Sequence, residues 1–241
     1  MTSYDGIIAR VVPGAEFHQN RYARELDARV RPGCRWLDVG AGSRLHRGWL
    51  GTAPDALAAR AQWVIGCDLE PSGLAANPVL TAAEIADATR LPHPDGSFDL
   101  VTANMVLEHV PNAAPMFTEV ARVLAPGGQF AFVTPHLGHP AVRLMSMIPR
   151  GTRSAFAHMT DSRANADIFP THYAVNTPDV VRRCAAAAGL RVDCLEVFFS
   201  YPVFRTPAAA VWLEALWIRA MMGSGLGARV GSNLVGVLQK D

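Results

Sequence analysis

Short apolar runs alternate with helix-like segments along most of this sequence, and this alternation restricts the fold more than any other feature. The runs predict strands at 36–39, 63–67, 84–86, 98–103, 130–134, 191–198 and 233–239. Helices are predicted at 16–30, 53–61, 113–124, 178–188 and 207–222. Strands that alternate with helices favour a largely parallel sheet with helices on both faces. We therefore predict an α/β fold with a doubly wound, mostly parallel sheet of seven strands.

Residues 136–171 interrupt this alternation and carry Pro, Gly, His and Met without clear periodicity. We predict that they form an inserted cap over the mouth of a pocket, together with residues 200–226. The 241 residues suit one α/β domain with insertions, because single domains of this class often reach that length. We therefore expect a single domain over 1–241, with its ligand-binding half at about 16–136.

The charge of the chain is nearly balanced, with a formal net charge of +1 and a pI of about 7.8. A nucleic-acid-binding domain is expected to be strongly basic, so no nucleic-acid partner is predicted. The four cysteines lack Cys-x-x-Cys spacing and an accompanying histidine cluster. We therefore expect reduced thiols, no metal site and a cytoplasmic protein. The N-terminal segment 1–14 has no signal-peptide pattern.

The helix predicted at 207–222 is apolar on most sides. It is shorter than a membrane span and is interrupted by Glu214 and Arg219, so no transmembrane helix is predicted. A place in the core or in a homodimer interface is the leading interpretation. A wall for an apolar ligand, or a contact with a membrane surface, stays open as an alternative.

A glycine-containing turn, LDVGAG (37–42), ends the first predicted strand. Two glycines allow a sharp turn and let a ligand approach the backbone at the carboxyl end of a strand. A dinucleotide site needs a third glycine where this chain has Leu45. The carboxylate of Asp38 is a poor neighbour for a pyrophosphate. It suits a ligand that bears an ammonium group, and it can also brace the loop by accepting N–H bonds.

Two further aspartates follow predicted strands. Asp68 ends the second strand, where a carboxylate can accept both hydroxyls of a ribose, although it could instead start the turn at 71–73. Asp87 follows the third strand, where its carboxylate can accept from an adenine amino group while the N–H of Ala88 donates to the ring. A solvated loop aspartate is the ordinary alternative for Asp87.

Four series in this order resemble class I S-adenosylmethionine-dependent methyltransferases, in particular the group that acts on small molecules: WLDVGAG (36–42), GCDLEP (66–71), ADATRLPHPDGSFDLVTANMVLEHV (86–110) and EVARVLAPGGQFAFVTP (119–135). The resemblance is close over about 34–136 and looser over 171–192. It implies a Rossmann-like fold, S-adenosylmethionine as cofactor, S-adenosylhomocysteine as product and a small-molecule acceptor.

The resemblance also implies a role for each matching residue. The methionine part of the cofactor would lie along Gly40, Ala41 and Gly42, and Asp38 would order this loop and favour the cationic end. The ribose would bind Asp68, and the adenine would contact Leu69, Asp87 and Ala88. The sulfonium would lie above Asn104 and Met105, and Tyr22 would reach the cofactor carboxylate from the helix at 16–30.

One position departs from the family, because Arg44 stands where a third glycine is common. Its side chain could point to solvent, crowd the loop or pair with the cofactor carboxylate.

Methyl transfer requires alignment of the acceptor, exclusion of water and, for some acceptors, removal of a proton. The candidates for a base are His109, His136 and His172, because histidine can take a proton near neutral pH. Each could equally be a structural histidine. The alternatives to a small-molecule methyltransferase are an RNA or protein methyltransferase and a cofactor-binding scaffold without methyl transfer.

Overall fold

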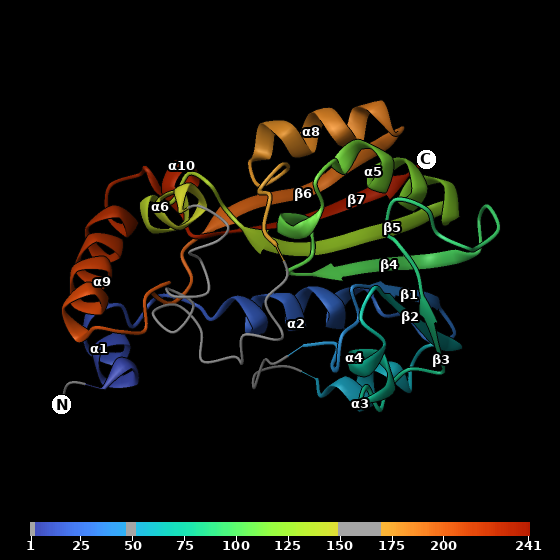
Figure 1. Cartoon of the computed structure of the whole chain (residues 1–241), viewed down its shortest axis with the longest axis horizontal. Helices are drawn as coiled ribbons and strands as arrows, with labels where there is room; N and C mark the ends of the chain where they lie inside the picture. The colour runs from blue at the N-terminus through green and yellow to red at the C-terminus, as the bar shows by residue number, and fades with distance from the viewer. Residues whose placement is uncertain (1–2, 47–51, 149–169) are drawn as a thin grey trace.

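A computed structural model describes residues 3–46, 52–148 and 170–241 (Figure 1). Its centre is a seven-stranded sheet in the order β3-β2-β1-β4-β5-β7-β6. The strands are β1 (Arg35–Val39), β2 (Trp63–Asp68), β3 (Ala82–Ile85), β4 (Phe98–Asn104), β5 (Leu124–Pro135), β6 (Leu190–Phe198) and β7 (Asn233–Lys240). Strands β1 to β5 pair in parallel, and β7 runs antiparallel to both β5 and β6. The predicted fold class is confirmed.

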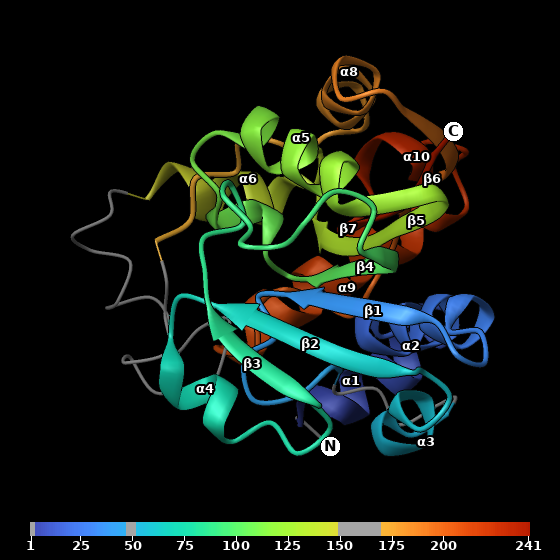
Figure 2. The same cartoon turned by 90° about the vertical axis from the view of Figure 1, so that its right-hand side faces the viewer.

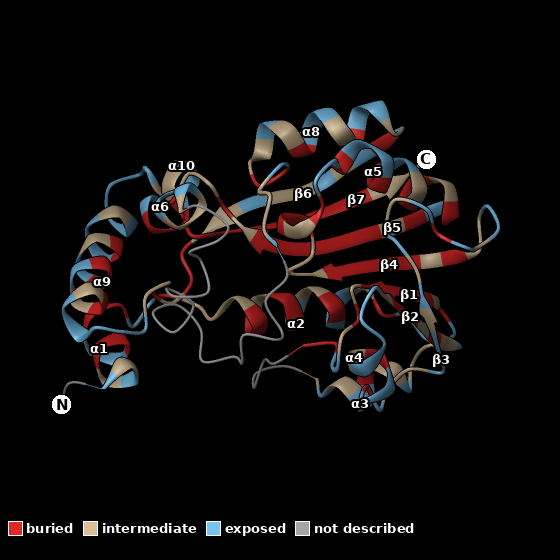
Figure 3. Cartoon of the chain, in the orientation of Figure 1, coloured by how far each residue is buried: buried red, intermediate tan, exposed pale blue. Residues whose placement is uncertain are grey.

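Helices cover both faces of the sheet (Figure 2). Helices α5 (Ala113–Val123) and α8 (Pro178–Ala187) bury Phe117 and Val181 against one face. Helices α2 (His18–Arg29) and α3 (Pro54–Ala58) bury Leu26 and Leu57 against the other. The central strands β1, β4, β5 and β7 are largely buried (Figure 3), because helices cover both faces of the sheet there, whereas the edge strand β3 is largely exposed.

Two predicted boundaries were wrong. The fifth strand begins at Leu124 instead of Phe130. Leu124 already pairs with Phe98 of β4, and the next pair is Gln129 with Leu100. Residues 125–128 therefore form a bulge within a strand that continues on both sides of it. Helix α3 ends at Ala58, because the N–H groups of Arg60 and Ala61 return to the carbonyls of Leu57 and Ala58 as turns. In addition, residues 71–73, considered as a turn, begin the short helix α4 (Pro71–Ala75).

Four helices lie beyond the carboxyl ends of the parallel strands (Figure 1). They are α1 (Tyr4–Val11), α6 (Pro140–Met147), α9 (Ala208–Met222) and α10 (Gly227–Val230). Helices α1 and α9 share an apolar cluster that includes Ile7, Val11, Val211 and Ile218. We call α6 and the segment 199–230, which contains α9 and α10, the cap. Residues 149–169 of the predicted insertion lie outside the described residues. The single domain over 1–241 stays a prediction, which the continuous sheet supports.

Within the described ranges, no helix combines the length and the apolar character needed to cross a membrane. The cysteines Cys34, Cys67, Cys184 and Cys194 are free thiols.

The core between α5 and the sheet should be sensitive to cavity formation. The ring of Phe117 is fully buried and meets the ring of Phe130 edge to face, with 5.8 Å between the centroids. We expect Phe117→Ala to lower the free energy of unfolding by about 3–5 kcal/mol, because the void left by the ring is only partly refilled. The exposed Leu144 is a control, and Leu144→Ala should change it by less than about 0.5 kcal/mol. Urea titration followed by circular dichroism measures both; equal losses would contradict this description of the core.

Candidate active site

The glycine-containing loop leaves β1 and is fastened to the end of β2. Gly40 and Gly42 have positive φ angles of 66° and 45°. The N–H groups of Gly40 and Ala41 donate to the Cys67 carbonyl at 2.7 and 3.1 Å, and the N–H of Gly42 donates to Asp68 Oδ2 at 2.9 Å. The backbone of the loop is therefore held in one conformation at the carboxyl end of the sheet.

A residue that no sequence motif marks supports this loop from below. Asn77 is buried, and its amide donates to the carbonyls of Ala41 and Gly42 at 3.1 and 3.3 Å. Asn77 follows α4 and carries no motif, so its function could be recognised only once the fold placed it under the loop.

Asp38 is buried at the end of β1 and its side chain bonds within the sheet. Its Oδ1 accepts from the hydroxyl of Thr102 at 2.6 Å, and that hydroxyl in turn accepts from the indole N–H of Trp36 at 2.7 Å. The predicted bracing of the loop by Asp38 is not seen, because the loop amides donate to Cys67 and Asp68 instead. Burial raises the pKa of Asp38 to about 7, although the hydrogen bond from Thr102 opposes this shift.

The four residues predicted to contact the nucleoside, Asp68, Leu69, Asp87 and Ala88, line the same cleft as the loop. Asp68 accepts from two backbone N–H groups, those of Gly42 and Glu70, through different oxygens. A carboxylate offers about four acceptor sites, so Asp68 retains capacity for two hydroxyl donors. Leu69 lies beside it in the cleft lining and is 62% exposed.

Asp87 uses one oxygen locally and leaves the other for a ligand. Its Oδ1 accepts from the N–H and the hydroxyl of Thr89, both at 2.8 Å. Ala88 lines the cleft next to it. These local bonds hold the carboxylate of Asp87 at the cleft wall.

The end of β4 forms the floor of the cleft. Asn104 and Gln19 exchange hydrogen bonds between their amides at 2.9 Å in each direction, and Asn104 also donates to the Leu45 carbonyl at 2.9 Å. Gln19 comes from α2 and was not predicted, because glutamine in a charged helix reads as a solvated residue. Met105 has a φ of 57°, and a non-glycine residue held in this region is commonly functional.

These residues surround a cleft of about 1160 Å³ at the carboxyl end of the sheet. One part of its wall holds the glycine loop and the three aspartates. Another part is apolar and aromatic and comes from α1, the start of α2, α6 and the segment 199–207. The apolar and aromatic residues of this second part include Tyr4, Phe17, Val142, Met145, Tyr201 and Val203, and the charged Arg205 lies among them.

We call residues 199–207 the strap, and it is tied to several elements. Glu214 of α9 accepts from the N–H groups of Val203 and Phe204 at 2.8 and 2.9 Å. The hydroxyl of Tyr4 donates to the Pro202 carbonyl at 2.8 Å, and the guanidinium of Arg205 stacks on the Tyr4 ring at 4.8 Å. Burial raises the pKa of Glu214 to about 7, while the two backbone N–H bonds oppose the shift.

The structure places the three candidate bases differently. His109 lines the cleft, and its Nδ1 lies 3.1 Å from the Pro170 carbonyl. Because a carbonyl only accepts, neutral His109 carries its proton on Nδ1 and can take one at Nε2. His136 is buried, away from the cleft wall, and bonds the Gly231 carbonyl through Nδ1 at 2.9 Å. His172 lies between the cleft residues Thr171 and Tyr173 but does not itself line the cleft.

Beside His109, the buried Glu108 also lines the cleft and was missed as a site residue. Its Oε2 accepts from the hydroxyl of Thr134 at 2.9 Å, and Asn176 donates to that same hydroxyl oxygen at 2.7 Å. Its carbonyl accepts from the N–H groups of His172 and Tyr173. Glu108, which follows β4, thus joins the end of β5 to the segment 170–176.

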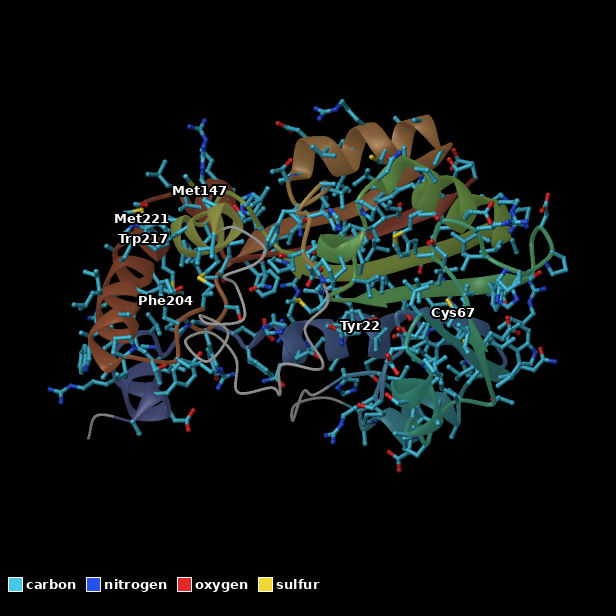
Figure 4. The ribbon with its side chains drawn as sticks, in the orientation of Figure 1. Tyr22, Cys67, Met147, Phe204, Trp217 and Met221 are labelled. Carbon is cyan, nitrogen blue, oxygen red and sulfur yellow. The ribbon has the colours of Figure 1, made fainter. Side chains whose placement is uncertain are left out.

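Tyr22 and Arg44 were the two looser matches. Tyr22 lies on α2 (Figure 4), is fully buried and is absent from the lining of the cleft, a position that does not favour the predicted contact with the cofactor carboxylate. Arg44 lines the cleft with an exposed side chain, so it does not crowd the loop. No cluster of potential metal ligands occurs in the ranges that the structure describes.

Comparisons with known proteins show which proteins this sequence and this fold resemble. Residues 37–132 match the family described as "Methyltransferase domain". A demethylmenaquinone methyltransferase of Beutenbergia cavernae is 38% identical over 113 residues, which cover 44% of each chain. One of Mycobacterium tuberculosis is 33% identical over 147 residues, 56% of this chain and 60% of the relative. The chain therefore spans about half the length of the curated relatives it matches.

A solved structure of an S-adenosylmethionine-dependent methyltransferase from Mesorhizobium loti has a TM-score of 0.55. It covers 90% of this chain and 96% of that chain at 22% identity, which speaks for the fold alone. Residues 37–132 therefore resemble a methyltransferase domain, and the fold is similar to that of an S-adenosylmethionine-dependent methyltransferase.

The glycine loop yields a prediction about backbone strain. A Cβ on Gly40 would lie 2.3 Å from Val106 Cγ2, besides requiring a positive φ. We expect Gly40→Ala to lower the free energy of unfolding by more than the roughly 1–2 kcal/mol that an alanine in a left-handed backbone conformation costs by itself. Gly127→Ala is the matched control, since Gly127 has a φ of 76° and open space around its Cα. Chemical denaturation measures both, and equal costs would show that Val106 does not constrain the loop.

Asp38 yields a prediction about pH. An unfolded aspartate titrates near pH 4, so between about pH 4 and 7 the folded chain binds one more proton at Asp38 than the unfolded chain. The contribution of Asp38 to the free energy of unfolding therefore falls as pH rises through this window. Asp38→Asn should gain stability relative to the native protein from pH 4 to 7, by up to about 4 kcal/mol.

The control for this measurement is Asp99→Asn. Hydrogen bonds from Arg35 lower the pKa of Asp99, so its contribution is present above the unfolded pKa and is lost as pH falls. Between pH 4 and 7 this variant should show no relative gain. If the free energies of unfolding of Asp38→Asn and the native protein differ by the same amount from pH 4 to 7, then Asp38 is charged over that whole range in the folded protein.

Proposed function

We propose that this chain transfers the methyl group of S-adenosylmethionine to an apolar small-molecule acceptor. The observation that carries the proposal is the position of Asp68, Asp87 and the glycine loop on one wall of a cleft whose other wall is aromatic and apolar. The relatives named demethylmenaquinone methyltransferase support a small-molecule acceptor. A cleft of about 1160 Å³ has room for a cofactor and an acceptor together.

The residues present fit the cofactor. Asp68 retains acceptor capacity for the ribose hydroxyls, and Asp87 Oδ2 for the adenine amino group, while Leu69 offers an exposed apolar surface to the ring. A Cβ on Gly73 would lie 3.1 Å from the Cα of Gly42, so this glycine lets α4 approach the loop closely.

Asp38 would hold the cationic end of the cofactor. A nearby ammonium favours the carboxylate, so binding would lower the raised pKa of Asp38 and release a proton near neutral pH. Thr102 and Trp36 keep this carboxylate in place through their chain of hydrogen bonds.

When bound, S-adenosylmethionine supplies an electrophilic methyl group. The chain contributes alignment and exclusion of water, because the strap and α6 present Tyr201, Val203 and Met145 to the acceptor side. His109 Nε2 is the atom that would take a proton from an acceptor that must lose one, since among the three candidate histidines it alone lines the cleft.

Calorimetric titration with S-adenosylmethionine and S-adenosylhomocysteine, with NAD as the unrelated nucleotide, tests the cofactor. We expect binding of both adenosyl compounds and none of NAD. Asp68→Ala should weaken binding by at least about tenfold, because it removes charge-assisted hydrogen bonds. Asp179→Ala, at an exposed aspartate on α8, is the matched control and should bind normally. A folded, ligand-free protein that binds neither compound would refute the assignment.

The acceptor class is tested by label transfer. The protein is incubated with a lysate of its host and with S-adenosylmethionine that carries a labelled methyl group. We expect the label in the organic extract. Label confined to RNA or protein would contradict a small-molecule acceptor.

A further inference from the structure

Large exposed apolar side chains gather on the cap. Of the eight such residues in the described ranges, only Leu69 and Ile85 lie elsewhere, and Leu69 lines the cleft. The other six are Leu144 (57% exposed), Met147 (73%), Leu213 (73%), Leu216 (52%), Met222 (42%) and Leu226 (44%). Single exposed leucines are ordinary, but a gathering of this kind marks a contact surface.

Helix α9 has two apolar faces. Val211, Ala215 and Ile218 point into the cluster shared with α1. The opposite face carries a stripe of exposed residues at helical spacing, Ala209, Leu213, Leu216 and Ala220. The first face has its partner within the chain, and the second leaves two large leucines in solvent. Figure 3 shows exposed residues along the outer side of α9, at the end of the molecule farthest from β3.

The exposed charges on the cap all have one sign. Within residues 136–148 and 199–232, the exposed charged residues are Arg143, Arg205, Arg219 and Arg229. The carboxylate in these segments, Glu214, is buried and bonded to the strap. The neighbouring α1 adds Asp5 and Arg10, which balance each other. The cap therefore combines apolar side chains with a net positive charge.

The apolar side chains and the net positive charge of the cap favour an anionic lipid surface over a second copy of this chain as its partner. A symmetric contact with a second copy of this chain would bring four arginines towards four arginines, with no exposed cap carboxylate among the described residues to neutralise them. An anionic lipid surface supplies the missing charge and also accepts leucine and methionine side chains at the boundary with the acyl chains.

The surface also lies beside the apolar part of the cleft. Helix α6 presents Val142 and Met145 to the cleft and exposes Leu144 and Met147 to solvent. Glu214 ties α9 to the strap that lines the cleft. Figure 4 shows Met147, Trp217 and Phe204 together at this end of the molecule.

We propose that the cap is a docking surface for anionic membranes, which binds the lipid headgroup region through its arginines and inserts the exposed leucines and methionines of α6 and α9. Docking on this face brings the apolar part of the cleft close to the bilayer. The proposal does not depend on methyl transfer, because the surface can bind lipid whatever the cleft contains.

Vesicle sedimentation without cofactor tests the proposal. We expect the full chain to bind vesicles that contain phosphatidylglycerol and phosphatidylcholine, and to bind phosphatidylcholine alone much more weakly. Raised salt should weaken binding, because it screens the arginines. The double variant Leu213→Glu/Leu216→Glu should bind at least about tenfold more weakly, because it removes apolar insertion and adds repulsion. The control is Ile85→Glu, which puts a glutamate in place of an apolar residue that is 68% exposed on β3, away from the cap. This variant should bind the anionic vesicles as the native protein does.

Circular dichroism and titration with S-adenosylhomocysteine show whether the double variant keeps its fold and its cleft. Trp212 and Trp217 on α9 report insertion through a blue shift of their fluorescence. A folded native protein that does not bind the anionic vesicles would overturn the proposal, and so would equal binding by the double variant. A dimer that the double variant dissociates, without vesicle binding by the native protein, would assign the surface to a second copy instead.

Discussion

The attachment of the glycine loop to the end of β2 is the constraint on which the rest of the site depends. One carbonyl, that of Cys67, accepts from two successive loop amides, and the carboxylate of Asp68 accepts from the third. Parallel pairing of β1 with β2 places Val39 opposite Cys67. The loop therefore leaves β1 beside Cys67 and Asp68, the last two residues of β2. The same pairing leaves Asp68 facing the cleft, where it can bind the loop and a ligand together.

A second constraint comes from the cap, which completes the cleft that the sheet begins. The strap has no regular structure, so it depends on bonds from Tyr4, His18 and Glu214 for its position. Glu214 is buried to make these bonds, and its raised pKa reflects the cost of that burial. The outer side of the same helix is apolar and the cap around it is cationic, which links the acceptor part of the cleft to a membrane surface in our proposal.

The sequence predicted the sheet well because its signals are local. Buried strands, such as 36–39, and the turn at Gly40 follow from residues adjacent in the chain. The positions of Asp68, Asp87 and Asn104 followed from strand order, since parallel strands bring their carboxyl ends to one edge. All three line one cleft in the structure, although their contacts with a cofactor stay predictions.

The sequence could not identify residues whose role depends on distant partners. Gln19 is bonded to Asn104 from 85 positions away, and Asn77 supports a loop 35 positions earlier. His136 was a candidate base from the sequence, ranked below His109, but the fold buries it against Gly231. Helix α1 was not predicted, because its apolar face is short and is buried only by packing against α9, which is distant in the sequence. Tyr22 illustrates the reverse case, because a residue that matches a family position is buried away from the cleft here.

A crystal structure of the protein with S-adenosylhomocysteine tests the central claim most directly. The account predicts the ribose hydroxyls within hydrogen-bond distance of Asp68, the adenine beside Leu69 with its amino group on Asp87, and the amino acid part along Gly40 and Gly42. The sulfur should face the side of the cleft formed by the strap. A ligand bound elsewhere, or bound in this cleft without contact to Asp68 and Asp87, would contradict it.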